Sequence, residues 1–276
     1  GGIQKRVNYY NKLSNTVLLK DPIQLSDIKK IPGSKVYFFD LYQYSRYFNQ
    51  KLKGLFLFGD IVKVPEQPTF VKSRPIVDNN ANSVLLKWNK LRHFMFIKKE
   101  QRTFLEKKNM LVSRGKVHKT QPHRIKFMEQ YYNHPMCNIG RVNTNELSPL
   151  WKVPRLTIDQ QLAYKFILCL EGNDVASNLK WVMSSQSIAV MPKPKFETWF
   201  MEGTLVADVH YIKIKDDYSD LEQRLTYFIE NQDKALQIIT NANTYVQQFK
   251  DQKTEALISL LTLKKYFEKT DQSKLL

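Results

Sequence analysis

One segment of the chain combines residue types and a spacing suited to holding a phosphate group. Residues 170–180 read Leu-Glu-Gly-Asn-Asp-Val-Ala-Ser-Asn-Leu-Lys and follow the apolar run 166–170. Gly172 lets the backbone approach a ligand, and the small residues Ala176 and Ser177 leave the start of a following helix open. The N–H groups of that helix start could hold a phosphate. The same residues also fit an ordinary capped turn.

Other chemistries lack their motifs. The chain has neither the G-x-G-x-x-G of dinucleotide binding nor a Walker pattern, and it has no G-x-S-x-G elbow. Its 5 His residues show no metal-binding spacing. No zinc-finger or RNA-recognition motif is present. With 2 Cys, the chain has too few for a disulfide framework or a zinc site, and Cys169 in its apolar run is predicted to be a buried thiol.

The charge is strongly positive and unevenly distributed. The chain has 43 Lys and Arg residues against 26 Asp and Glu, a formal net charge of +17. Residues 87–126 hold thirteen basic residues and two acidic ones, which is most of the excess. Such a surplus indicates an anionic partner: a nucleic acid, an anionic membrane surface or a phosphorylated substrate.

Hydrophobic periodicity predicts the elements that position these residues. The length of 276 residues allows one large or two small domains. Short apolar runs at 36–39 and 54–60 indicate buried strands, residues 87–107 have helical spacing, and Ser219 with Glu222 fits a capping box. Further strands are predicted at 110–113, 166–170, 187–191 and 210–214, and helices at 124–132, 175–184, 221–229, 234–248 and 254–269. Strands alternating with helices predict a parallel α/β sheet.

The sequence gives no sign of a membrane-spanning or exported segment. Its longest apolar stretch, around 256–263, is far shorter than the about 20 residues that cross a bilayer. No signal peptide is recognisable at the start. The sparse cysteines fit a reducing compartment. We therefore expect a cytoplasmic protein.

Several separated segments occur together in a specific order. They are Leu170–Trp181, Met191-Pro-Lys-Pro, Glu197–Gly203, His210-Tyr211 and Asp217–Leu221, preceded by Gly59-Asp60, Val71–Ile76 and Ser83–Lys87. In this order they resemble glycosyltransferase family 90, and the upstream segments resemble its bacterial branch. The resemblance covers residues 55–250.

The resemblance implies an α/β, GT-B-like fold with two Rossmann-like halves and a cleft between them. The halves would be an N-terminal acceptor-side domain, 1–108, and a C-terminal nucleotide-sugar-binding domain, 109–253. The last helix, at 254–276, would pack back on the first half. The implied reaction is an inverting transfer of a hexose or xylose from a UDP-sugar, with no cofactor and no metal. The absence of an Asp-x-Asp triplet fits that expectation.

The resemblance also implies an acceptor and a location. The acceptor would be a hydroxyl of a lipopolysaccharide core or another surface glycan, carried on an anionic glycolipid. The protein would then lie peripherally at the inner face of the bacterial inner membrane. The basic residues of 87–126 would be attracted to such a surface.

A general base is implied at Asp60. The family places an Asp after an apolar strand, with Val-Pro four and five residues later, and this chain has Asp60 with Val64-Pro65. A carboxylate there would take the proton of the acceptor hydroxyl as its oxygen attacks the sugar. An Asp that simply forms a turn after Gly59 fits the same residues.

The donor site is implied by two further blocks. An Arg-Gly-Lys turn is followed by Pro-x-Arg, and Arg124 with Lys116 would grip the diphosphate. In the second block Ala176 and Asn178 replace the family's Ser and Arg, so that Ser177 and Asn178 would substitute for them. The implied diphosphate positions are Arg114, Gly115, Lys116, Arg124, Gly172, Ser177 and Asn178. The implied sugar or base contacts are Lys72, Arg74, Glu171, Asp174, Lys180 and Glu197.

Two other functions remain open from the sequence. A nucleic-acid-binding protein would use the basic stretch 87–126, with its interleaved aromatic residues, and its affinity would fall steeply with salt. A carbohydrate-binding relative without activity is the other alternative, because Asn178 replaces a family Arg.

Overall fold

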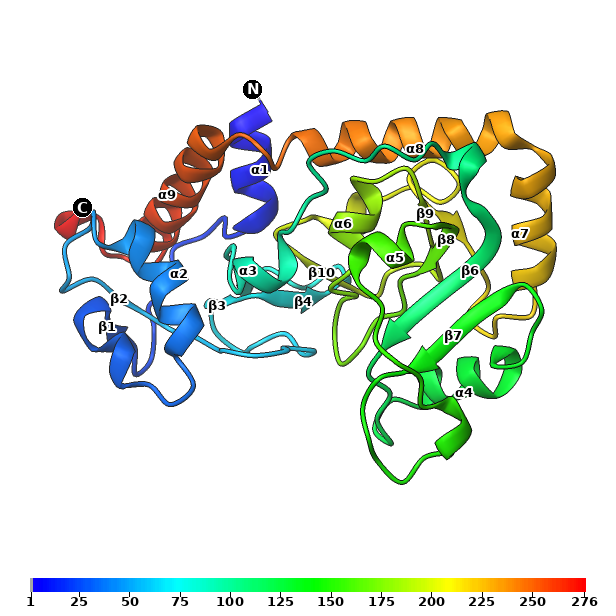
Figure 1. Ribbon diagram of the computed structural model, residues 1–276. Helices are drawn as coiled ribbons and strands as arrows, with labels where there is room; N and C mark the ends of the chain where they lie inside the picture. The colour runs from blue at the N-terminus through cyan, green and yellow to red at the C-terminus, as the bar shows by residue number, and fades with distance from the viewer. Residues whose placement is uncertain (1) are drawn as a thin grey trace. The chain divides into compact units, whose positions relative to one another are not determined.

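A computed structural model describes residues 2–276, which form two compact units (Figure 1). Unit 1 takes the chain up to His93, then Lys195–Gly203 and Phe249–Leu276. Unit 2 takes Phe94–Pro194 and Thr204–Gln248. These units differ from the expected division after residue 108, because 94–108 lie in unit 2 and a short internal segment returns to unit 1.

Unit 2 is built on a five-stranded parallel sheet. Its strands are β6 (Lys108–Gly115), β7 (Cys137–Arg141), β8 (Tyr164–Leu168), β9 (Ile188–Met191) and β11 (Ile212–Lys213). They lie in the order β11-β9-β8-β6-β7, and every neighbouring pair is parallel. The structure therefore confirms the predicted parallel α/β sheet.

Helices accompany this sheet in unit 2, and some of them share its core. They are α4 (Pro122–Tyr131), α5 (Ile158–Gln161), α6 (Leu179–Met183), α7 (Leu221–Glu230) and α8 (Gln232–Gln247). Leu111, Phe166 and Val190 of the sheet pack with Phe127 of α4 and Leu225 of α7 in one buried cluster. Two single-turn 3-10 helices also lie in this unit, at Phe104–Glu106 and Pro149–Trp151. Another 3-10 turn, Glu202–Thr204, follows β10.

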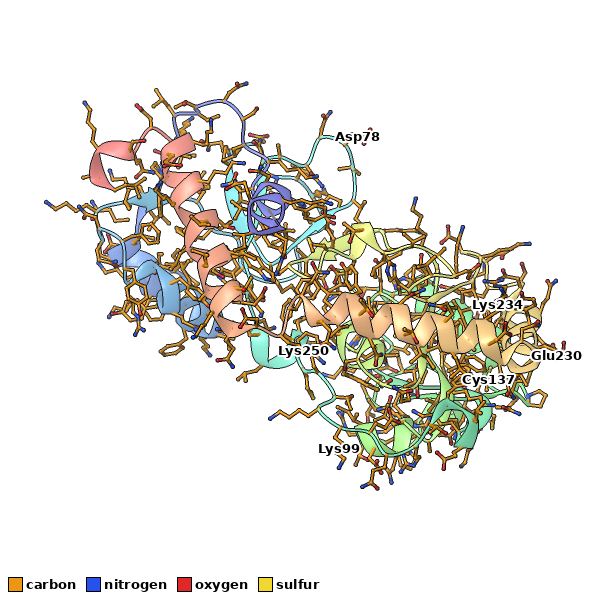
Figure 2. All side chains as sticks on the ribbon, turned by 90° about the horizontal axis from the view of Figure 1, so that it is seen from above. Asp78, Lys99, Cys137, Glu230, Lys234 and Lys250 are labelled. Carbon is orange, nitrogen blue, oxygen red and sulfur yellow. The ribbon has the colours of Figure 1, made fainter. Side chains whose placement is uncertain are left out.

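Both cysteines lie in or directly next to strands of the sheet of unit 2. Cys137, labelled in Figure 2, begins β7, and Cys169 directly follows β8. Both thiols are free and buried, which confirms the prediction for Cys169. Burial raises the pKa of Cys137 to about 12 and also raises that of Cys169.

Unit 1 combines helices with short paired strands. Its helices are α1 (Gly2–Tyr10), α2 (Lys35–Ser45), α3 (Lys90–His93) and α9 (Gln252–Lys269), with 3-10 turns at Leu25–Lys30 and Ser273–Leu275. Its strands are β1 (Ile23–Gln24), β2 (Lys53–Gly54), β3 (Thr69–Val71), β4 (Ser73–Pro75), β5 (Ser83–Leu85) and β10 (Phe196–Thr198). Figure 1 shows α1 beside α9, which contact each other.

The strands of unit 1 form pairs rather than one sheet. β1 pairs with β2 and β4 with β10, both antiparallel, while β3 and β5 are parallel. Phe70, Trp88 and Tyr266 lie in the core of this unit. Within residues 2–276, a Rossmann-like sheet is thus found in unit 2 and no second one in unit 1.

Two apolar runs predicted as strands in unit 1 have other structures. Residues 36–39 belong to α2, because Tyr37, Leu41 and Tyr44 recur at helical spacing and pack on the core. Of 54–60, only Gly54 lies in a named strand. Phe56 then forms a single bridge to Phe70, and the rest is irregular.

The helix predicted at 87–107 is wrong. The structure has only the four residues of α3 and a 3-10 turn there. The chain passes from unit 1 to unit 2 after His93. Trp88 is therefore buried in one core and Phe104 in the other, while Leu91 is 91% exposed. Apolar residues that belong to two cores cannot share one helix face.

Three predicted boundaries in unit 2 are also corrected. The helix expected from 175 begins at Leu179, because the Asn178 side chain donates to the Leu168 carbonyl instead of continuing a helix. The strand expected at 210–214 is confined to β11. The capping box is absent, because the Ser219 hydroxyl bonds to Asp217 and α7 begins after Asp220.

Candidate functional site

The strand order of unit 2 marks one edge of its sheet as the place for a ligand. The chain runs from β6 outward to β7, and then returns to β8 on the other side of β6. In open parallel sheets, ligands bind beyond the carboxyl ends of the two strands where the order reverses. Here those strands are β6 and β8, and the turns that follow them are 115–117 and 169–178.

Arg124 of α4 joins these two turns. Its Nη1 donates to the Lys116 carbonyl at 2.6 Å. Its Nη2 and Nε donate to the carbonyls of Leu170 and Glu171 at 2.8 and 3.0 Å. A guanidinium offers five donors in a rigid fork, so it can bridge both turns at once. The structure therefore places Arg124 between the turns that follow β6 and β8, bonded to main-chain oxygens.

Two glycines allow this close approach. A Cβ added at Gly115 would lie 3.6 Å from Nη1 of Arg124, and one added at Gly172 would lie 3.3 Å from Nη2. The second contact is tighter than normal packing allows without a shift of the guanidinium. The structure thus brings Gly115, Arg124 and Gly172 together, as expected for one site.

Residues that the sequence analysis missed support the same turns. Gln121 donates to the Asn173 side chain at 3.2 Å, and a ring nitrogen of His123 lies 2.7 Å from the Glu171 carbonyl. Tyr218 donates to the His123 carbonyl at 3.0 Å, and burial raises its pKa to about 12. Gln121 and His123 flank the Pro of the Pro-x-Arg segment, which is the signal that could have found them.

Other expected donor residues lie elsewhere or face inward. Arg114 donates to the carbonyls of Asn138 and Pro154 at 3.0 and 3.1 Å, and burial lowers its pKa. It therefore stabilises the β6–β7 edge. Asp174 and Lys180 are buried. The side chains of Lys116, Glu171 and Ser177 are exposed or half-buried at the turns, whereas that of Asn178 is bonded to Leu168.

In unit 1, Asp60 lies on a loop fixed by its neighbours. Gly59 has φ +98°, a conformation that favours glycine, and so sets the turn. Asp60 Oδ1 lies 2.6 Å from Nζ of Lys72. The Lys72 side chain is only 2% exposed while that of Asp60 is 37% exposed. Ser73 Oγ accepts from the backbone N–H of Ile61 at 3.3 Å. A carboxylate is therefore held in one position with part of it open to solvent.

Arg74 and Glu197, expected as sugar or base contacts, form a buried ion pair. They face each other in the β4–β10 register, with Nε of Arg74 2.8 Å from Oε1 of Glu197, and both side chains are buried. Arg74 also donates to the carbonyls of Tyr9 and Ser83, and Glu197 accepts from the Tyr9 hydroxyl. This network holds unit 1 together. Both side chains are shielded from solvent, so neither is accessible to a sugar or a base in this conformation.

Seven of the thirteen basic residues of the stretch 87–126 make the following contacts within the protein. Five of its cations form ion pairs: Lys87 with Glu255, Lys90 with Asp40, Arg102 with Asp159, Lys107 with Glu100, and Lys119 with Glu146. Arg114 and Arg124 donate to carbonyls. The stretch is also divided between the two units. These contacts weaken the interpretation of the stretch as one nucleic-acid-binding face.

Two further features concern residues 2–276 as a whole. No group of three or more His, Cys, Asp or Glu side chains among them is arranged to hold a metal ion. None of their helices has the length and apolar character needed to cross a bilayer.

Comparison with known proteins gives consistent matches. The family model for "Glycosyl transferase family 90" matches residues 78–262. The chain is 42% identical over 267 residues to the O-glucosyltransferase LpsA of Dichelobacter nodosus, covering 96% of this chain and 82% of that protein. It is also 28% identical over 115 residues to uncharacterized protein 179R of Invertebrate iridescent virus 6, covering 39% of this chain and 9% of that protein.

Proposed function

Because the chain belongs to the bacterial branch of glycosyl transferase family 90 and is a glycosyltransferase, we propose that it transfers glucose from UDP-glucose to a glycan hydroxyl. Glucose is chosen because the Dichelobacter nodosus relative is named an O-glucosyltransferase. The acceptor we propose is a lipopolysaccharide core or another surface glycan, at the inner face of the bacterial inner membrane.

The observation that carries the proposal is the arrangement of Gly115, Arg124 and Gly172. All three meet beyond the carboxyl ends of β6 and β8, where the strand order reverses. A donor with a diphosphate fits this edge, because glycine turns allow the backbone close to phosphate oxygens. The bound guanidinium adds a fixed positive charge beside them.

Binding of the UDP-sugar and departure of UDP would both depend on positive charge at this edge. Negative charge grows on the diphosphate as the bond to the sugar breaks, and fixed cations stabilise that charge. Arg124 is fixed by the carbonyls of both turns, and exposed Lys116 can reach the phosphate oxygens. We expect these two cations to replace a divalent metal, so that EDTA leaves the rate unchanged.

Asp60 is the proposed general base. The acceptor oxygen attacks the anomeric carbon from the face opposite UDP, the hydroxyl proton passes to the Asp60 carboxylate, and UDP leaves with the bonding electron pair. The configuration at the anomeric carbon is therefore inverted. Lys72 pairs with the carboxylate and orients it.

Thermal unfolding with a panel of nucleotides and nucleotide sugars tests the donor. A ligand at 100 times its Kd adds about 2.7 kcal/mol, which shifts the Tm by a few degrees. We expect stabilisation by UDP and UDP-glucose, with or without EDTA. Equal stabilisation by every polyanion would instead support nucleic-acid binding. Binding of UDP-glucose without any hydrolysis or transfer would support the inactive relative.

A further inference from the structure

Helix α2 of unit 1 presents a stripe of exposed aromatic and basic side chains. Lys35, Phe39, Tyr42 and Arg46 recur at spacings of four, three and four residues, which places them on one helix face, with Arg46 at the C-cap. All four are exposed, Phe39 by 71% and Tyr42 by 45%. We call these four residues the α2 stripe. It places two aromatic rings between two cations.

The opposite face of α2 is occupied by the core of unit 1. Tyr37, Leu41 and Tyr44 pack into that core, and α2 contacts α9, as Figure 1 shows. The α2 stripe is therefore not needed to hold the helix in place. Exposed aromatic residues that gather on one side of an element mark an interaction surface.

The charge around the stripe is positive. Asp40 is the single acidic residue of α2, and it is paired with Lys90 of α3, whose Nζ lies 3.5 Å from Oδ1. The backbone N–H of Lys90 also donates to Asp40 at 3.1 Å. Two further exposed apolar residues lie close to the stripe in the chain, Val36 on α2 and Tyr47 just after Arg46. No acidic side chain of α2 opposes an anionic partner.

We propose that the α2 stripe docks unit 1 on an anionic phospholipid surface. Aromatic rings settle at the level of lipid headgroups, and flanking Lys and Arg residues bind the anionic phosphates. A second copy of this chain fits less well, because a two-fold contact would bring Lys35 and Arg46 against the same charges. The proposal assigns membrane attraction to α2 rather than to the basic stretch 87–126.

The stripe also has a physical connection to Asp60. Tyr37, on the buried face of α2, stacks on Phe58 with ring centroids 5.2 Å apart. Phe58 lies two residues before Asp60 and also contacts Trp88. Docking α2 would therefore hold the Asp60 loop near the lipid surface that carries the acceptor. This connection to the acceptor rests on the proposed function, whereas docking itself does not.

Vesicle flotation of the full chain tests the docking. The probes are phosphatidylcholine vesicles with and without phosphatidylglycerol. We expect binding only when phosphatidylglycerol is present, and at least a tenfold loss for Phe39→Ser combined with Tyr42→Ser. The matched control is Leu150→Ser in unit 2, because Leu150 is 70% exposed and lies outside the stripe. The control should bind like the wild type.

A charge-reversal pair keeps the test independent of the aromatic variant. Lys35→Glu with Arg46→Glu should reduce binding by about tenfold or more, since each basic residue near an anionic bilayer contributes separately. The matched control is Lys98→Glu with Lys99→Glu, an exposed basic pair of unit 2. This control should reduce vesicle binding much less. An equal loss from both pairs would show attraction by net charge and would overturn the stripe.

Three further results would also overturn the proposal. The first is that the wild type binds neither kind of vesicle. The second is that it binds vesicles with and without phosphatidylglycerol equally well. The third is that a stripe variant dissociates a dimer of this chain without changing vesicle binding. UDP-glucose hydrolysis is measured on the same variants and should be unchanged. Lost vesicle binding with intact hydrolysis supports docking, and absent hydrolysis in the wild type bears on the proposed function alone.

Discussion

The turns of unit 2 and the Asp60 loop of unit 1 are stabilised in different ways. In unit 2, the proposed donor edge consists of main-chain atoms at the ends of two neighbouring strands, joined by Arg124. In unit 1, the proposed base lies on an irregular loop and is paired with Lys72, while Ser73 accepts a hydrogen bond from the neighbouring backbone N–H of Ile61.

The difference indicates how each region can vary. An edge built from topology and glycine needs few particular side chains, so Asn178 in place of a family Arg can be tolerated while Gly115 and Gly172 remain. A base held by an ion pair depends on both partners. Substitutions in unit 1 should therefore alter the chemical step, and substitutions in unit 2 should alter donor binding.

The largest effect is expected for Asp60→Asn. Removing a general base lowers kcat by about 100- to 10,000-fold, because the acceptor proton has no recipient. The Kd for UDP should stay within about twofold. Transfer of radiolabelled glucose measures kcat, and isothermal titration calorimetry with UDP measures the Kd. Asp78→Asn is the control, since Asp78 is another exposed carboxyl of unit 1, labelled in Figure 2. Retained turnover in Asp60→Asn would remove Asp60 from the mechanism.

The next effect is expected for Arg124→Ala. It removes three charge-assisted hydrogen bonds to the two turns, so the affinity for UDP should fall by at least about tenfold. Arg124→Lys should bind UDP nearly as weakly as Arg124→Ala does, because an ammonium cannot bridge both turns. Arg155→Ala, an exposed Arg of unit 2, should bind normally. Full affinity in Arg124→Lys would mean that charge alone matters and would contradict the bridging role.

A smaller effect is expected for Lys72→Met. Without the cation, the Asp60 carboxylate loses the partner that holds it in position, so the transfer step should slow. We expect about a tenfold fall in kcat at pH 7 with an unchanged KM for the donor. Lys63→Met, in the same loop but exposed, is the control. A change in the donor KM with an unchanged kcat would show that Lys72 contacts the donor instead.

The smallest effect is expected at alkaline pH. Burial raises the pKa of Tyr218 to about 12, whereas an unfolded tyrosine titrates near about pH 10. Its contribution to the free energy of unfolding is therefore complete below about pH 10 and is lost as the pH rises toward 12. Urea unfolding should show a weaker decline over this range for Tyr218→Phe than for the wild type. Tyr227→Phe, on the exposed side of α7, should decline like the wild type.

The sequence predicts unit 2 better than unit 1, for a physical reason. The strands of unit 2 alternate with helices, so local periodicity identifies them, and a glycine or a Pro-x-Arg after a strand marks the edge. Unit 1 depends on pairings between distant segments, such as Arg74 with Glu197 across β4 and β10. Local patterns do not encode such register, so the buried pair was expected to contact the sugar or the base.

Strand alternation accounts for another difference within unit 2. Arg114 and Arg124 are both predicted at the diphosphate, yet Arg114 reaches Asn138 on β7. Its neighbour Gly115 is the residue that faces the Arg124 guanidinium. Successive residues of a strand point to opposite faces, so only one of two adjacent positions can face the site.

Hydrogen exchange of the amides in the presence of UDP tests the central claim most directly. The account predicts slower exchange at the turns 115–117 and 169–178 in the wild type and equally in Asp60→Asn. It predicts little change there in Arg124→Ala at the same UDP concentration. Protection confined to unit 1, or full protection in Arg124→Ala, would contradict the assignment of the donor diphosphate to the edge formed by β6 and β8.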